Sequence, residues 1–183
     1  MLSELDVYLD RKRQLMTAVR EAAPADASER QQKLSAQVIA EGSSGIRRIR
    51  IRDFQIITDT GPAIGGFDLG PRAPEVLLGA LGSCISHTIL IQAALQQIPI
   101  ESLVIDLSGE IDSLAGHTDV PGKVSNLEYT VTVESSATPS QIAGLTGLLG
   151  TICPVHNVVE HAQPLRATVI LNGQPVEAAA TRS

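Results

Sequence analysis

An uncharged stretch of twenty residues, from Val76 to Leu95, limits what this chain can fold into more than any other feature. Its length suffices for a helix that crosses a membrane. It also carries several polar side chains, His87 among them, and it lacks the basic and aromatic flanks that anchor a membrane span. A helix buried on all sides in a soluble core has the same composition. We therefore predict a core helix from Pro74 to about Gln97, where Pro99 ends it, and no membrane span.

The overall composition is that of one compact domain with an appendage. Of the 183 residues, 43% are hydrophobic and 19% are charged, which argues against a disordered or fibrous chain. Lys and Arg number 14 against 20 Asp and Glu, without a basic block or many aromatic residues, so nucleic-acid binding is not expected. The first residues are acidic where a signal peptide would be basic, which predicts a cytoplasmic protein.

Hydrophobic periodicity and turn residues predict an α+β fold with antiparallel strands. A first helix, capped by Ser3, is expected to end near Ala22. The other predicted elements are a hairpin of strands 33–40 and 46–58, an antiparallel pair of strands 102–111 and 126–134, a helix 138–150, a short helix 153–161 and a strand 165–171.

These elements divide the chain into three parts. Residues 1–28 are expected to form an N-terminal helical extension, because the helical pattern breaks after Ala22. Residues 29–173 form the main domain, and residues 174–183 a frayed tail.

The second strand of the predicted hairpin places arginines on one face. Arg48, Arg50 and Arg52 alternate with Ile49 and Ile51. Such a face is typical of a solvated strand, or of an edge strand guarded by charge. The alternative is that one of these arginines reaches a thiolate or a carboxylate.

The chain has two cysteines, Cys84 and Cys153, which lie 69 residues apart, so it is no disulfide-stapled secreted domain. Cys84 falls within the predicted core helix, where a cysteine is usually an inert small hydrophobic residue. Cys153 precedes Pro154 at the predicted start of a helix, where free backbone N–H groups and the helix dipole favour a thiolate. A histidine follows each cysteine three residues later, namely His87 and His156, on the same helix face.

Three chemistries compete for these four residues. A metal site with all four as ligands is possible, but neither pair has the spacing usual in structural zinc sites. A Cys-His hydrolase would need a third, orienting group, and no hydrolase signature is present. A dithiol pair that cycles between thiols and a disulfide requires only that the two cysteines meet in the fold. The dithiol pair is the most economical interpretation.

Several motifs resemble the OsmC/Ohr family of thiol peroxidases over about residues 33–172. They are Ile57-Thr-Asp59, Gly65-Gly66-Phe-Asp68 and Gly70-Pro71, the run from Pro74-Glu75 to Gly-Ser-Cys84, and Thr151-Ile-Cys153-Pro-Val-His156-Asn157. A cysteine in the middle of a long helix, paired with a distant Cys-Pro-Val at a helix start, is more specific than either half alone.

The resemblance implies an intertwined homodimer in which antiparallel sheets wrap two long central helices. It implies that Cys84 attacks an organic hydroperoxide to give a sulfenic acid, and that Cys153 resolves the sulfenic acid as a disulfide. An external dithiol reductant, dihydrolipoamide in much of the family, would then reopen the disulfide, and no cofactor is expected. A member of this fold that binds small molecules or senses redox state without catalysis is the alternative.

The family also uses a Glu at the helix start and an Arg from an N-terminal strand or loop to hold the thiolate. Glu75 corresponds to the Glu. The candidates for the Arg are Arg47, Arg48, Arg50, Arg52 and Arg72, and of these Arg48 or Arg50 is favoured. On a regular helix nine steps of ~100° place Glu75 about half a turn from Cys84, so direct pairing needs an irregular first turn. Otherwise Glu75 is a first-turn carboxylate favoured by the helix dipole. His87 and His156 are secondary candidates, which either tune the thiols or make ordinary structural hydrogen bonds.

Overall fold

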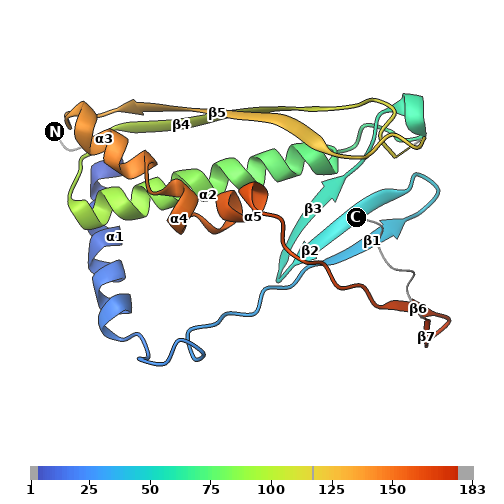
Figure 1. Ribbon diagram of the computed structural model, residues 1–183, viewed down its shortest axis with the longest axis horizontal. Helices are drawn as coiled ribbons and strands as arrows, with labels where there is room; N and C mark the ends of the chain where they lie inside the picture. Colours follow the sequence, from blue (N-terminus) through green and yellow to red (C-terminus); the bar gives the residue numbers. More distant parts are fainter. Residues whose placement is uncertain (1–3, 117, 177–183) are drawn as a thin grey trace.

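The computed structural model describes residues 4–116 and 118–176, which form helices and three separate antiparallel sheets (Figure 1). Ser3, the predicted first cap, lies outside the described residues. The elements in chain order are α1 (Glu4–Glu21), β1 (Gln37–Glu41), β2 (Ile46–Ile51), β3 (Phe54–Thr58), a 3-10 turn η1 (Pro62–Ile64), α2 (Ala73–Gln96), β4 (Ser102–Ile111), β5 (Val124–Glu134), α3 (Pro139–Thr146), α4 (Leu149–Ile152), α5 (Pro154–Glu160), β6 (Val169–Leu171) and β7 (Gln174–Val176).

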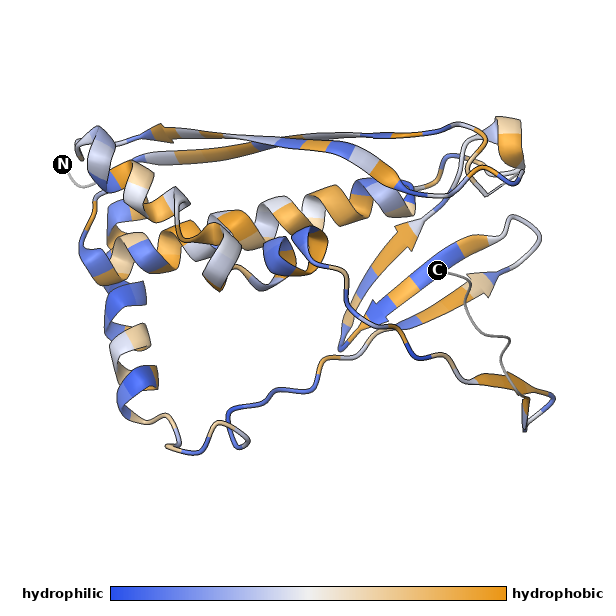
Figure 2. Cartoon of the chain, in the orientation of Figure 1, coloured by the Kyte–Doolittle hydropathy of each residue, from blue (hydrophilic) through white to orange (hydrophobic). Residues whose placement is uncertain are grey.

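Helix α2 is the predicted core helix and the axis of the fold (Figure 1). It begins where the Arg72 backbone N–H and the Glu75 carboxylate form a capping box, and it ends where Gln97 adopts a left-handed conformation. Its length and composition also suit a membrane span, a test that core helices of soluble proteins pass as well, and a third of its most apolar 18-residue window is buried within this chain. Orange segments along α2 in Figure 2 mark this apolar surface.

The strand pair β4–β5 lies along one side of α2 (Figure 1). The two strands pair antiparallel from Ser102 opposite Glu134 to Ile111 opposite Val124, as predicted, with an irregularity between Ser108 and Glu110. The inward-facing apolar residues of both strands pack on a core built from α2, Ile98, Ile100, α3 and α4; they are Leu103, Ile105, Leu107, Val131 and Val133.

The predicted hairpin is instead a three-stranded meander, and this part of the prediction was wrong. The expected strand 46–58 is split into β2 and β3 by a two-residue turn at Arg52 and Asp53. Arg52 has a φ of 54°, a left-handed conformation that a β-strand cannot contain. Because no glycine marks this turn, the sequence read as one strand.

The C-terminal third also differs from the prediction. Helix α3 is capped by Thr138 as expected, but it ends at Thr146, and α4 continues as a separate short helix rather than reaching residue 150 as one element. Only Val169–Leu171 of the predicted strand 165–171 is a strand. A turn at Asn172 and Gly173, both at positive φ, returns the chain as β7, so the expected frayed tail begins as a hairpin.

The loop from residue 59 to 71 connects the meander to α2 and is closed around a buried carboxylate. Asp59 is fully buried, and its Oδ2 accepts hydrogen bonds from the backbone N–H groups of Phe67 (3.0 Å) and Leu69 (3.2 Å). Hydrogen bonds from the N–H groups of Thr60 and Phe67 hold the pKa of Asp59 below its usual value. Gly66 lies directly against the Thr60 carbonyl, where any Cβ atom would clash. This contact explains Gly66, the φ of 84° explains Gly65, and the hydrogen bonds to Phe67 and Leu69 explain Asp59.

We expect Gly66→Ala to destabilise the protein by about 1–3 kcal/mol or more, because the methyl group has no space beside the Thr60 carbonyl. The matched control is Gly144→Ala in helix α3, where nothing lies within 4 Å of the added carbon. Alanine there should stabilise the helix by about 0.5–1 kcal/mol. Urea unfolding of both variants measures the difference, and an unchanged midpoint for Gly66→Ala would contradict the close approach.

Candidate functional site

The two cysteines meet although 69 residues separate them in the sequence. The Cys153 thiol donates to the Cys84 sulfur across 3.3 Å, and both are free thiols. Cys153 is completely buried, whereas Cys84 is partly exposed. A disulfide has an S–S length of about 2.05 Å, so a small movement of either side chain would bring the sulfurs to bonding distance. Of the two, Cys84 is the thiol that a molecule in solution can reach.

A break between two short helices positions Cys153. Its backbone N–H closes the last turn of α4 by bonding the Leu149 carbonyl, and the same residue is the N-cap of α5. Pro154 disfavours a helical conformation in the preceding residue, and Cys153 accordingly has extended φ and ψ angles of −89° and 108°. The break lies against the middle of α2, where Cys84 is located (Figure 1).

The surroundings of Cys84 favour the neutral thiol. Burial raises the pKa of Cys84, and the adjacent Cys153 raises it further. Hydrogen bonds from the Val155 backbone N–H and the Thr88 hydroxyl oppose this shift but do not cancel it. In this arrangement Cys84 is therefore a neutral thiol. Two hydrogen-bond donors that would stabilise its thiolate are already in place.

The two histidines have different environments. Desolvation of the ring and the nearby Lys12 ammonium lower the pKa of His87, so this imidazole is neutral at neutral pH. His156, on α5, places its Nε2 atom 3.5 Å from the Tyr129 hydroxyl, and the two rings meet edge to face at 5.8 Å. On the other side of the ring, Nδ1 lies 3.5 Å from Glu160 Oε2.

Glu75 is paired with its neighbour in this chain. Its Oε2 accepts from the Arg72 backbone N–H at 2.7 Å, and its Oε1 accepts from the Arg72 guanidinium at 2.9 Å. These hydrogen bonds lower the pKa of Glu75. No hydrogen bond or ion pair joins Glu75 to Cys84 among the described residues. The arrangement is that of a first-turn carboxylate in a capping box.

Arg48 and Arg50 lie on the meander and are also engaged there. Arg48 binds both carboxylate oxygens of Glu41, at 2.7 and 2.8 Å, and donates to Gln55 at 2.7 Å. The charge of Arg50 acts on the same Glu41. Within one chain the structure thus brings Cys84 and Cys153 together, with His156 on the adjacent turn. Glu75 and Arg48 are in local pairs, and Arg50 acts on Glu41 through its charge.

Metal binding by the cysteine and histidine set finds no support in the geometry. Across residues 4–116 and 118–176, no three His, Cys, Asp or Glu side chains gather as they would around a metal ion.

Sequence reasoning missed Thr88 and Tyr129 as neighbours of the site. The spacing of four residues between Cys84 and Thr88 could have identified Thr88, whereas the position of Tyr129 depends on tertiary packing.

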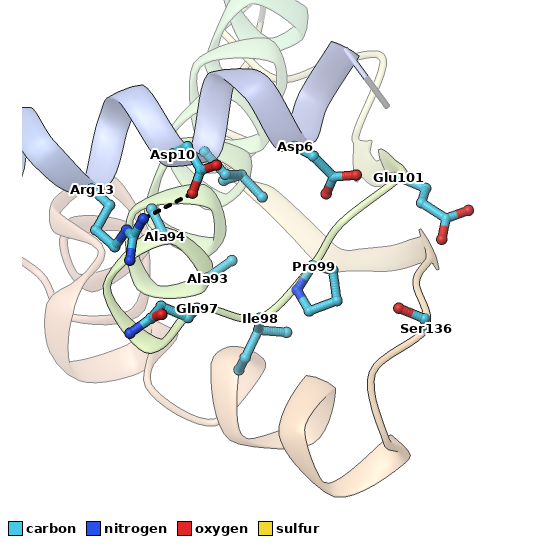
Figure 3. A pocket seen from close by; sticks show the side chains of 11 residues that line it. Asp6, Asp10, Arg13, Ala93, Ala94, Gln97, Ile98, Pro99, Glu101 and Ser136 are labelled. Carbon is cyan, nitrogen blue, oxygen red and sulfur yellow. Dashed lines mark hydrogen bonds and ion pairs between the residues drawn. The ribbon is translucent and has the colours of Figure 1, made fainter. Parts of the chain in front are cut away.

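Two hollows lie near the core. A groove of about 830 Å³ between β5 and α3 is lined mainly by apolar side chains and includes Tyr129, Val131, Val133 and Ile142. A second pocket, of about 410 Å³, lies between α1 and the end of α2 and contains the Asp10–Arg13 ion pair (Figure 3). Neither cysteine lines either hollow. The groove adjoins the α5 turn at Tyr129, whose hydroxyl lies 3.5 Å from His156 Nε2.

We expect Thr88→Val to raise the pKa of Cys84 further, because the substitution removes a hydroxyl that donates to the sulfur. A higher pKa leaves less thiolate at pH 8, so iodoacetamide should alkylate Cys84 several-fold more slowly, with the rate profile displaced to higher pH. Measurement in a Cys153→Ser background isolates this thiol. The control is Ser86→Ala, which removes a hydroxyl bonded to the Ser83 carbonyl of the same helix; equal rates for both variants would exclude the Thr88 contact.

The comparisons with known proteins agree on one family. The sequence profile of the family described as OsmC-like protein matches residues 66–168, which include both cysteines. A comparison with curated proteins found no significant match.

Several solved structures share the fold. An OsmC-like protein from Mycoplasma pneumoniae has a TM-score of 0.62 and 19% identity, and the match covers 72% of this chain and 89% of that one. An OsmC-like protein of unknown function from Vibrio cholerae has a TM-score of 0.54 and 20% identity, covering 71% and 95%. A third, from the same species, is designated an organic hydroperoxide resistance protein and has captopril in one of its active sites; its TM-score is 0.53 and its identity 14%, covering 72% and 88%. At these identities the likeness is one of fold.

Proposed function

The chain belongs to the OsmC-like protein family, and we propose that it is a thiol-dependent peroxidase that reduces organic hydroperoxides to alcohols. The observation that carries this proposal is the 3.3 Å contact between the Cys84 and Cys153 sulfurs, one reachable from solution and the other buried. The designation of a fold neighbour as an organic hydroperoxide resistance protein supports the choice of substrate class.

In the first step, the Cys84 thiolate attacks the distal oxygen of the hydroperoxide. An S–O bond forms and the O–O bond breaks, so that Cys84 becomes a sulfenic acid and an alkoxide leaves, which takes up a proton to become the alcohol. The partial exposure of Cys84 supports its assignment as the attacking thiol. The Val155 N–H and the Thr88 hydroxyl stabilise the thiolate that this step requires.

In the second step, Cys153 attacks the sulfur of the sulfenic acid and water leaves. The buried position of Cys153 protects it from direct oxidation, and its contact with Cys84 allows resolution with little movement. An external dithiol, for which dihydrolipoamide is the family-level expectation, then reduces the disulfide and returns both thiols.

We propose that the working unit is a homodimer, because the meander has an apolar face that no other element among residues 4–116 and 118–176 covers. Val38, Ile49 and Ile56 are direct neighbours across β1, β2 and β3, and Phe54 extends the same face. Val38 is 58% exposed and Phe54 64% exposed. None of the helices in the described part of the chain packs across this sheet (Figure 1). Apolar faces of this kind normally mark an interface.

The C-terminal hairpin β6–β7 leads to the same proposal. An isolated two-stranded hairpin is only marginally stable in water. Ile170 and Leu171 are more than half exposed, and among the described residues β6 and β7 have extensive contacts only with each other. In a dimer, the meander and hairpin of one chain would cover the exposed surface of α2 in the other and would bring further charged residues toward the thiols, Arg48 and Arg50 among the candidates.

A non-enzymatic role in redox sensing or small-molecule binding is the second candidate function. Two observations favour it: the pKa of Cys84 is raised, and Glu75 is bound to Arg72. A thiol without an activating cation reacts slowly with peroxides. The peroxidase assay below separates the two functions.

The direct test is stopped-flow consumption of tert-butyl hydroperoxide and of hydrogen peroxide by the reduced protein. We expect rapid reaction with the organic peroxide, loss of this reaction in Cys84→Ser, and accumulation of a sulfenic acid in Cys153→Ser, since the resolving thiol is then absent. Equally slow reactions of the wild type and both variants would exclude the peroxidase and favour the binding or sensing role.

The dimer is tested by sedimentation of the reduced protein, which should show twice the 19.3 kDa mass of the chain. We expect Ile56→Glu to produce monomers, because it places a charge on the uncovered apolar face. The matched control, Gln55→Glu, changes the adjacent residue on the opposite face and retains an oxygen acceptor for Arg48. Two monomeric species, or two unaffected dimers, would contradict an interface at this face.

A further inference from the structure

One imidazole beside the thiols takes no part in the steps above. The Nδ1 atom of His156 is buried and has no hydrogen bond from the described residues, although Glu160 Oε2 is 3.5 Å away. A buried polar atom left without a hydrogen bond is destabilising. The His156 side chain is 18% exposed and that of Glu160 53% exposed, so the carboxylate is free to turn onto Nδ1. Glu160 is therefore placed to orient this ring.

The packing of α5 on α4 leaves room for the carboxylate. A Cβ atom at Gly150 would lie 3.4 Å from Glu160 Oε2, in ordinary van der Waals contact, so the carboxylate lies beside this glycine. The Gly150 carbonyl also accepts from the Asn157 side chain, at 3.3 Å, which ties α4 to α5. The Glu160 carboxylate thus lies where α4 and α5 meet, with the His156 ring beside it.

The other ring nitrogen of His156 faces a phenol. Nε2 lies 3.5 Å from the Tyr129 hydroxyl, and the rings are nearly perpendicular, at 84°. Tyr129 shares the inward face of β5 with Val131 and Val133, and all three line the groove between β5 and α3. Glu160, His156 and Tyr129 therefore form a line that runs from an exposed carboxylate to the wall of an apolar groove.

The same turn of α5 contacts the thiols. Cys153 is the N-cap of α5, the Val155 N–H donates to the Cys84 sulfur, and His156 is the next residue. One short segment therefore fixes the resolving thiol, a donor to the attacking sulfur and the imidazole. The phenol and carboxylate are the titratable groups that face His156 from β5 and from α5 itself.

We propose that Glu160, His156 and Tyr129 are a proton relay for the leaving oxygen of the peroxide, an inference that rests on the proposed peroxidase function. As the Cys84–oxygen bond forms and the O–O bond breaks, the Tyr129 hydroxyl gives its proton to the departing alkoxide, which becomes the alcohol. His156 returns a proton to the phenolate from Nε2, and solvent at the exposed Glu160 restores the proton on His156. Tyr129 is the catalytic residue of this relay, and His156 and Glu160 are positioning residues that act through it.

The test exploits leaving groups that differ in their need for a proton. An alkoxide from tert-butyl hydroperoxide must be protonated, whereas the acetate released by peracetic acid leaves without a proton. In Tyr129→Phe and His156→Gln we expect the rate with tert-butyl hydroperoxide to fall on the order of 10²-fold, as for loss of a general acid. The rate with peracetic acid should not change. The control is His161→Gln, the same substitution at an exposed histidine that contacts the Asn157 carbonyl.

The outcomes separate the relay from the function on which it rests. A wild type that reacts slowly with both peroxides would disprove the peroxidase, and the relay with it. A fast wild type with variants that lose both reactions equally, or lose neither, would leave the peroxidase intact and overturn the relay. Tyr129→Phe removes one oxygen atom from a side chain that is 39% exposed, so it remains a valid test if His156→Gln does not fold.

Discussion

The apolar surface of helix α2 is the constraint on which the rest of this structure depends. A helix of 24 residues without a charge after Glu75 must be covered along most of its length. Within the chain, β4–β5 covers one side, α1 crosses near the C-terminal end, and α4 and α5 pack on the middle. The thiol site is a consequence of this packing, because the break between α4 and α5 places Cys153 against the partly exposed Cys84 of α2.

Burial sets the chemistry of the two sulfurs in opposite ways. Complete burial keeps Cys153 from solutes, so that it can react only with a neighbour, while partial burial raises the pKa of Cys84 and holds it as a thiol. Hydrogen bonds from Val155 and Thr88 act against burial, and a cation placed beside Cys84 would also favour the thiolate. In its present surroundings Cys84 is therefore held as the neutral thiol, which is the less reactive form.

The elements that the sequence predicted well are those with strong local signals. Helix α2 follows from its uncharged run and Pro74, the pair β4–β5 from alternation, and the meeting of Cys84 and Cys153 from family motifs. The turn at Arg52 and Asp53 has no glycine or proline to mark it, and the β6–β7 hairpin depends on an Asn-Gly signal at the expected end of the domain, after the last predicted strand. The pairing of Glu75 with Arg72, and of His156 with Tyr129, depends on side-chain orientations that spacing does not encode.

The local pairs of Glu75 and Arg48 do not by themselves decide against catalytic roles. The Arg72 and Glu75 side chains are 52% and 47% exposed, and those of Arg48 and Glu41 are 29% and 32% exposed. Ion pairs this accessible to water contribute little to stability, since solvent screens the attraction and ordering two long side chains costs entropy. A thiolate within reach could therefore draw either guanidinium, that of Arg48 or that of Arg72, from its carboxylate partner. The apolar face of the meander that carries Arg48 is uncovered in the described part of the chain. Whatever packs on this face therefore also decides whether Arg48 contacts a sulfur.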